Sequence, residues 1–172
     1  SKVDGSARFG IDVSVPGMLT AVLVRCPHFG GRLRSCDAAQ TLASAGVQRV
    51  LEFETAVAVV ADGYWQARRG AERLQLEWDK GPLAGLDSAA ITAAQRGRLR
   101  ESGHVVREEG EAPDPERVAG TLTAEYRVPY LAHAAMEPLA AVASVAAGRA
   151  EIWAGTQGPD VLQAMVARRL GI

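Results

Sequence analysis

Two apolar runs joined by a very short link constrain the fold of this chain more than any other feature. Residues 47–53 and 56–61 are rich in valine and other strand-forming residues, and only Glu54 and Thr55 separate them. A link this short can join antiparallel strands but not parallel ones, so the sequence predicts a β-hairpin. Apolar residues make up 48% of the chain, which is enough for a buried core around it.

The residues before the hairpin predict further strands. Residues 18–25 form an apolar, β-branched run after the Pro16-Gly17 turn, which is typical of a strand. Because the run is apolar on both faces, we expect it to be central in a sheet. Residues 13–15 could add a short strand, and residues 27–35 are rich in glycine and arginine, which favours a loop.

Helices are expected on both sides of the hairpin. Asp37 can cap a helix over 38–45, and Asp62 can cap a second helix over 63–74. A strand over 74–78 then follows. The resulting order β-α-β-β-α-β predicts an α+β fold, a mixed sheet with packed helices.

The middle of the chain looks like a connector. Asp87 or Ser88 can cap a helix over 89–101, and the acidic, proline-bearing residues 108–117 are typical of a solvated linker. Residues 121–128 alternate larger apolar side chains with small and polar ones, which favours a strand.

Composition excludes several classes of partner. With 19 Lys and Arg against 20 Asp and Glu, the net charge is −1, which predicts no binding to nucleic acid or to an anionic membrane. No apolar run approaches the roughly 20 residues that a transmembrane helix needs. Cys26 and Cys36 are expected to be free thiols, with a loop disulfide or a metal set including His28 as alternatives.

Two polar residues stand close together near the end of the chain. His133 and Glu137 would share one face of a helix, where they could bind a metal or act as an acid–base pair, as in a small metal-dependent hydrolase. Pro129 and Pro138 bracket the segment and disfavour a long helix. We therefore expect a structural role, with His133 bonded to backbone in a buried turn and Glu137 capping a backbone or pairing with a cation.

Gln157 is the strongest candidate for a binding residue. It is predicted to end a strand, immediately before Gly158 and Pro159 open a helix. Polar groups at strand ends beside helix starts are where α/β sheets place their ligands. The alternative is an amide that only satisfies the Gly-Pro turn.

These motifs resemble a known family. His-x-x-Met-Glu-Pro at 133–138, followed by Trp-x-x-Thr-Gln at 153–157, resembles the molybdenum-binding large subunits of the xanthine dehydrogenase and aldehyde oxidase superfamily. The nearest resemblance is to beta subunits of the isoquinoline 1-oxidoreductase type. Residues 2–13, 16–19 and 57–67 look like the α/β hammerhead domain of that family, in the family's order, and the resemblance is weakest over 81–118.

The resemblance implies a domain organisation. Residues 1–80 would be the hammerhead domain, 81–118 a connector with one helix, and 119–172 the first strands and helix of a molybdopterin-binding domain. The chain lacks an initial Met and stops just after a helix, so we expect it to be a piece of a longer polypeptide. Alone it should be inactive and bind no cofactor, because the family's catalytic glutamate and most cofactor contacts lie further along.

The resemblance also implies a function. The intact subunit would hydroxylate N-heteroaromatic or aldehyde substrates with water as the oxygen source, using a molybdenum-pterin cofactor of the cytosine dinucleotide form. Gln157 would donate a hydrogen bond to an oxo ligand of the metal, and electrons would leave through iron–sulfur clusters on a small partner subunit. A bacterial periplasmic or membrane-associated location is expected, with the cytoplasm as the alternative. The competing hypothesis is a non-enzymatic α+β module that binds other subunits.

Overall fold

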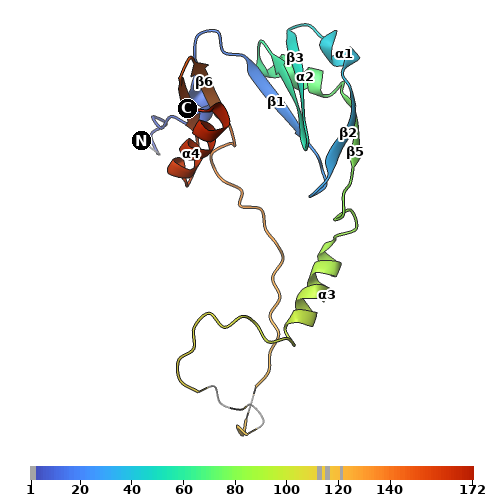
Figure 1. Cartoon of the computed structure of the whole chain (residues 1–172), viewed down its shortest axis with the longest axis vertical. Helices are drawn as coiled ribbons and strands as arrows, with labels where there is room; N and C mark the ends of the chain where they lie inside the picture. The colour runs from blue at the N-terminus through green and yellow to red at the C-terminus, as the bar shows by residue number, and fades with distance from the viewer. Residues whose placement is uncertain (1–2, 112–113, 115–116, 121) are drawn as a thin grey trace. The chain divides into compact units, whose positions relative to one another are not determined.

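The computed structural model describes residues 3–111, 114, 117–120 and 122–172, and the chain divides into two compact units (Figure 1). One unit is Leu19–Val128, and the other combines Ser1–Met18 with Pro129–Ile172. The second unit therefore brings together two segments that lie far apart in the sequence. These two units do not test the predicted domain boundaries after residues 80 and 118, which stay a prediction.

A three-stranded antiparallel sheet organises the Leu19–Val128 unit. Its order is β1 (Thr20–Arg25), β4 (Ala56–Ala61) and β3 (Val47–Phe53). The predicted hairpin is confirmed, because β3 and β4 pair with Phe53 opposite Ala56. The prediction that the first apolar run is central is wrong. β1 lies at an edge and its residues alternate between half-buried and exposed, whereas β4 is the central strand and is buried almost throughout.

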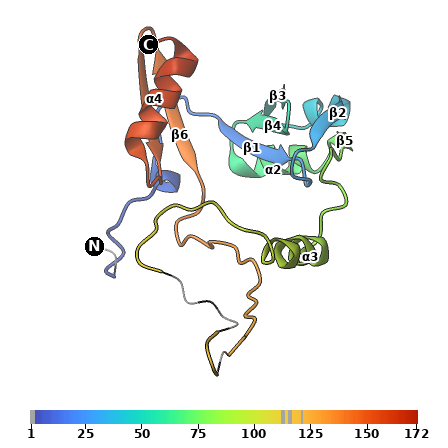
Figure 2. The ribbon, with the colours of Figure 1, turned by 60° about the horizontal axis from the view of Figure 1, so that its bottom comes forward.

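Two short helices cover this sheet. α1 (Ala39–Leu42) contacts β3, while α2 (Tyr64–Ala71) lies along β1 and β4 (Figure 2). Both are shorter than predicted. Asp62 does not cap α2, since its carboxylate accepts a 2.8 Å hydrogen bond from the Gln48 side chain instead. A nearby side-chain donor has thus replaced the helix backbone as the partner of this carboxylate.

Thr41 is a buried polar residue of this core. Its side chain is fully buried, and its hydroxyl donates a 2.9 Å hydrogen bond to the carbonyl oxygen of Gly70. The bond ties α1 to α2 beside the buried side chain of Val59 in β4.

Removing this hydroxyl should weaken the unit. Thr41→Val is expected to lower the free energy of unfolding by about 1 kcal/mol, because the hydrogen bond that joins α1 to α2 is lost while the side-chain volume is kept. Thr41→Ser keeps the hydroxyl and is the matched control for hydrogen bonding. Urea denaturation measures both, and a Thr41→Val variant as stable as the wild type would contradict the prediction.

A second sheet of the same unit pairs β2 (Arg32–Asp37) with β5 (Gln75–Asp79). The loop predicted over 27–35 is therefore wrong from Arg32 onward, while the strand predicted at 74–78 is confirmed within one residue. Pairing with β5 supplies backbone partners for Arg32–Asp37. This outweighs the loop preference of the local composition.

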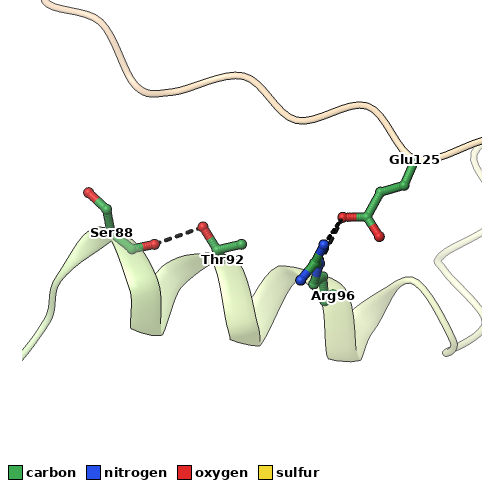
Figure 3. A network of polar contacts seen from close by, with 4 residues as sticks. All are labelled: Ser88, Thr92, Arg96 and Glu125. Atoms are coloured by element: carbon green, nitrogen blue, oxygen red, sulfur yellow. Dashed lines mark hydrogen bonds and ion pairs between the residues drawn. The ribbon is translucent and has the colours of Figure 1, made fainter.

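The connector holds α3 (Ser88–Arg98), and the predicted cap is confirmed. The Asp87 carboxylate accepts a 2.7 Å hydrogen bond from the backbone N–H of Ala90. Thr92 donates to the Ser88 carbonyl, and Arg96 pairs with Glu125 at 2.7 Å. Figure 3 shows both interactions along α3. Because Arg96 and Glu125 are both about half exposed, this ion pair contributes little stability.

The strand predicted over 121–128 is wrong for the part that the structure describes. Residues 122–128 are not in a strand, and residue 121 lies outside the described residues. An alternating pattern makes a strand only where a neighbour supplies backbone partners. Of the predicted linker 108–117, the described residues 108–111, 114 and 117 are outside helices and strands, and the other four are not described.

The other unit is a hairpin with one helix. β6 (Ala141–Ala146) pairs antiparallel with β7 (Arg149–Ala154), and α4 (Pro159–Leu170) lies beside them (Figure 1). The predicted helix start is confirmed, with Pro159 in the first turn. Residues 13–15 are not a strand; a 3-10 helix, η1 (Gly10–Asp12), precedes them. Among the described residues, no helix is both long and apolar enough to cross a membrane.

Candidate functional site

Gln157 lies in the loop between β7 and α4 with an exposed side chain. Since β7 ends at Ala154, the prediction that Gln157 itself ends the strand is wrong by three residues. The Thr156 hydroxyl accepts a 3.1 Å hydrogen bond from the backbone N–H of Gly158. This local turn ends the strand early and leaves the Gln157 amide outside the sheet ladder.

An open cavity of about 660 Å³ lies between β7 and α4 in this unit. Its lining is mainly apolar and includes Ile152, Ala154, Leu162 and Val166, together with the polar residues Arg149, Thr156 and Gln163. A mainly apolar hollow with a few polar groups at its edge is the usual form of a small-molecule site. Thr156, the residue before Gln157, lines this hollow, whereas Gln157 does not.

Glu137 holds together distant parts of the same unit. Its carboxylate Oε1 accepts a 3.1 Å hydrogen bond from the backbone N–H of Gly10, which is buried. The carboxylate also lies directly against Gly155, because a Cβ added there would stand 2.6 Å from Oε2. Glu137 thus contacts both the N-terminal segment and the residue that opens the Gln157 loop.

His133 lies in a different environment from Glu137. The segment from His133 to Glu137 is not helical, so the expected absence of a long helix is confirmed and the two side chains share no helix face. His133 is exposed, so the expectation that it lies in a buried turn is wrong. The structure therefore brings Glu137, but not His133, to the loop that carries Gln157.

The cysteines do not form a site. Cys26 and Cys36 are both free, as expected. Partial burial, together with the charges of Glu52 and Asp37, raises the pKa of the Cys36 thiol. In the described part of the chain, no group of three or more His, Cys, Asp or Glu side chains could hold a metal ion.

Sequence reasoning missed Gly10 and Gly155 as parts of this site. Both occur in the motifs that carry the family resemblance, Phe-Gly at 9–10 and Trp-Ala-Gly-Thr-Gln at 153–157. A glycine that shortly precedes a candidate ligand is a signal that another group approaches its backbone closely. Which group approaches could not be found from the sequence.

Comparison with known proteins gives consistent matches. Residues 99–172 match the molybdopterin cofactor-binding domain family. The chain is 31% identical over 190 residues to the beta chain of isoquinoline 1-oxidoreductase from Brevundimonas diminuta, covering 99% of this chain and 23% of that protein. It is 28% identical over 177 residues to one of the subunits of nicotinate dehydrogenase from Pseudomonas putida, covering 96% of this chain and 15% of that protein. The chain thus spans less than a quarter of the length of these curated relatives.

A solved structure supports the fold. Quinoline 2-oxidoreductase from Pseudomonas putida 86 matches with a TM-score of 0.68 and 23% identity, covering 95% of this chain and 26% of that chain. The predicted α+β fold class is confirmed by this likeness. The domain match and the curated relatives also confirm the resemblance found in the sequence: this chain is similar to molybdenum-binding subunits of the xanthine dehydrogenase and aldehyde oxidase superfamily.

Proposed function

We propose that the intact subunit is a molybdenum hydroxylase that hydroxylates an N-heteroaromatic or aldehyde carbon with water as the oxygen source. The observation that carries this proposal is the match of residues 99–172 to a molybdopterin cofactor-binding domain. Two relatives that are similar over almost the whole chain are named for isoquinoline and nicotinate oxidation, which favours an N-heteroaromatic substrate, and a third is named as an aldehyde dehydrogenase. When bound, the molybdenum cofactor supplies the two-electron oxidation of the substrate carbon.

Within this chain, Gln157 is the residue proposed to contact the cofactor. Its side chain is exposed in the loop after β7, so the amide can reach a group outside the hairpin. A carboxamide donates a hydrogen bond without bringing a charge into a site that excludes water. A carboxylate at the same position would repel an oxygen ligand, so the neutral donor fits the group that it would bind.

The remaining parts of the proposal concern partners. The cofactor would be the cytosine dinucleotide form, and electrons would pass to iron–sulfur clusters on a small partner subunit. The rest of the same subunit would supply the catalytic base and most cofactor contacts, so this chain alone should be inactive. A periplasmic or membrane-associated location is proposed for the enzyme, with the cytoplasm as the alternative.

Isotope labelling of the intact enzyme tests the function. We expect purified enzyme to contain molybdenum and to hydroxylate a set of N-heteroaromatic and aldehyde compounds, with ¹⁸O from labelled water appearing in the product. Mass spectrometry of the product measures the label. Label derived from molecular oxygen would overturn the proposal. An enzyme without molybdenum that still binds its partner subunits would favour the non-enzymatic alternative.

A further inference from the structure

We propose that Glu137 is a positioning residue that fixes the loop carrying Gln157. This inference rests on the proposed function only for what Gln157 does once it is positioned. The contacts that carry it lie within one compact unit and join η1, the segment before β6 and the loop after β7.

The first contact anchors the Glu137 carboxylate. The backbone N–H of Gly10 donates to Oε1 at 3.1 Å, although the two residues are 127 positions apart in the sequence. Glu137 is half-buried and Gly10 is buried, so this charge-assisted hydrogen bond is partly shielded from water. A Cβ at Gly10 would stand 3.3 Å from the carbonyl oxygen of Ala140, so the backbone there is closely packed.

The second contact joins the anchored carboxylate to the Gln157 loop. A Cβ added to Gly155 would stand 2.6 Å from Oε2 and 2.8 Å from Cδ of Glu137, distances that real side chains essentially never show. Gly155 does not require glycine for its backbone angle, because it is absent from the positive-φ glycines of the chain. Glycine at this position therefore leaves room for the Glu137 carboxylate where it stands, and a methyl group there would displace this side-chain end.

The far end of the loop is fixed locally. The Thr156 hydroxyl accepts from the Gly158 backbone N–H, and Pro159 begins α4 directly afterwards. Gln157 therefore lies between a start held by Glu137 and an end held by the turn into the helix. Loss of the Glu137 contact should free the start of the loop and spread the positions that the Gln157 amide occupies.

Hydrogen exchange of the full chain tests this without any cofactor. Glu137→Ala is expected to speed exchange of the Gly158 amide, which donates to the Thr156 hydroxyl, by about tenfold, because one of the two restraints on the loop is lost. Glu137→Gln keeps an acceptor oxygen and should stay close to the wild type. Glu151→Ala removes an exposed carboxylate from β7 and is the matched control, with no change expected in this loop.

A double-mutant cycle gives the sharpest result. Gly155→Ala alone should speed exchange, since its methyl group displaces the carboxylate. In the Glu137→Ala background the same change should have little further effect, because the space is then open. Independent effects of the two substitutions, or equal effects of Glu137→Ala and Glu151→Ala, would overturn the proposal. If Glu137→Ala does not fold, the Gly155→Ala variant decides the question. Exchange at the wild-type rate in Gly155→Ala would overturn the proposal. Faster exchange in Gly155→Ala, together with exchange at the wild-type rate in Glu137→Gln, would support it.

The intact enzyme separates this inference from the proposed function. Coupled exchange effects with unchanged turnover in Gln157→Ala would leave Glu137 as the positioning residue and remove Gln157 from the cofactor site. Reduced turnover in Gln157→Ala without coupled exchange effects would keep the proposed function and overturn the role of Glu137.

Discussion

Replacing Gln157 by alanine in the intact enzyme is expected to lower kcat by about 100- to 1,000-fold, the usual cost of removing one preorganised hydrogen-bond donor from a reacting oxygen. The amide is exposed in the loop after β7, so little of the fold depends on it. The loss should therefore appear in turnover and in the spectrum of the metal site, with protein stability unchanged. Steady-state kinetics, metal-site spectroscopy and thermal denaturation measure the three quantities.

A matched control separates a local effect from a general one. Gln40 is an exposed glutamine on α1, in the other compact unit, and Gln40→Ala removes the same amide group. We expect this variant to keep the turnover of the wild type. If Gln157→Ala also kept its turnover and its metal-site spectrum, Gln157 would have no part in the cofactor site.

One substitution made in two helices should have opposite effects on stability. Gly70 is buried in α2, where a Cβ would stand 2.8 Å from Val47 Cγ2 and 3.1 Å from Val59 Cγ1. These methyl groups belong to stiff, β-branched side chains, so they cannot easily move aside. Gly70→Ala is therefore expected to lower the free energy of unfolding by about 1–3 kcal/mol, the usual cost of overpacking.

Gly97 is the matched control for this change. It lies in the exposed helix α3, and no atom stands within 4 Å of the position that its Cβ would take. Gly97→Ala should stabilise α3 by about 0.5–1 kcal/mol, because alanine loses less backbone entropy in a helix. Urea denaturation and amide exchange of the two helices measure the effects. A stabilising Gly70→Ala would show that the core is less tightly packed than the structure indicates.

The sequence could predict elements whose cause lies in neighbouring residues. The β3–β4 hairpin follows from its two-residue link, the cap of α3 from Asp87, and the start of α4 from Pro159. The position of Gln157 was predicted less well. Its place near the end of a strand was correct, but the Thr156 turn ends β7 three residues before it.

Other features depended on partners that the sequence does not reveal. Residues 32–35 were predicted as part of a loop but lie in β2, which pairs with β5, whereas the strand-like residues 122–128 are not in a strand. β1 is apolar enough for a central strand, yet β4 takes the centre because it pairs on both edges. In each case, the presence or absence of a neighbouring strand that pairs with the segment decided its structure.

The sequence by itself therefore determined the α+β class, the hairpin, the helix starts and the family resemblance, because these depend on residues close together along the chain. Only the tertiary structure decided that Glu137 accepts from Gly10 and lies against Gly155, while His133 stays exposed. The physical reason is that a carboxylate finds its partner by spatial proximity. In this fold that partner lies 127 positions away, where no local pattern could indicate it.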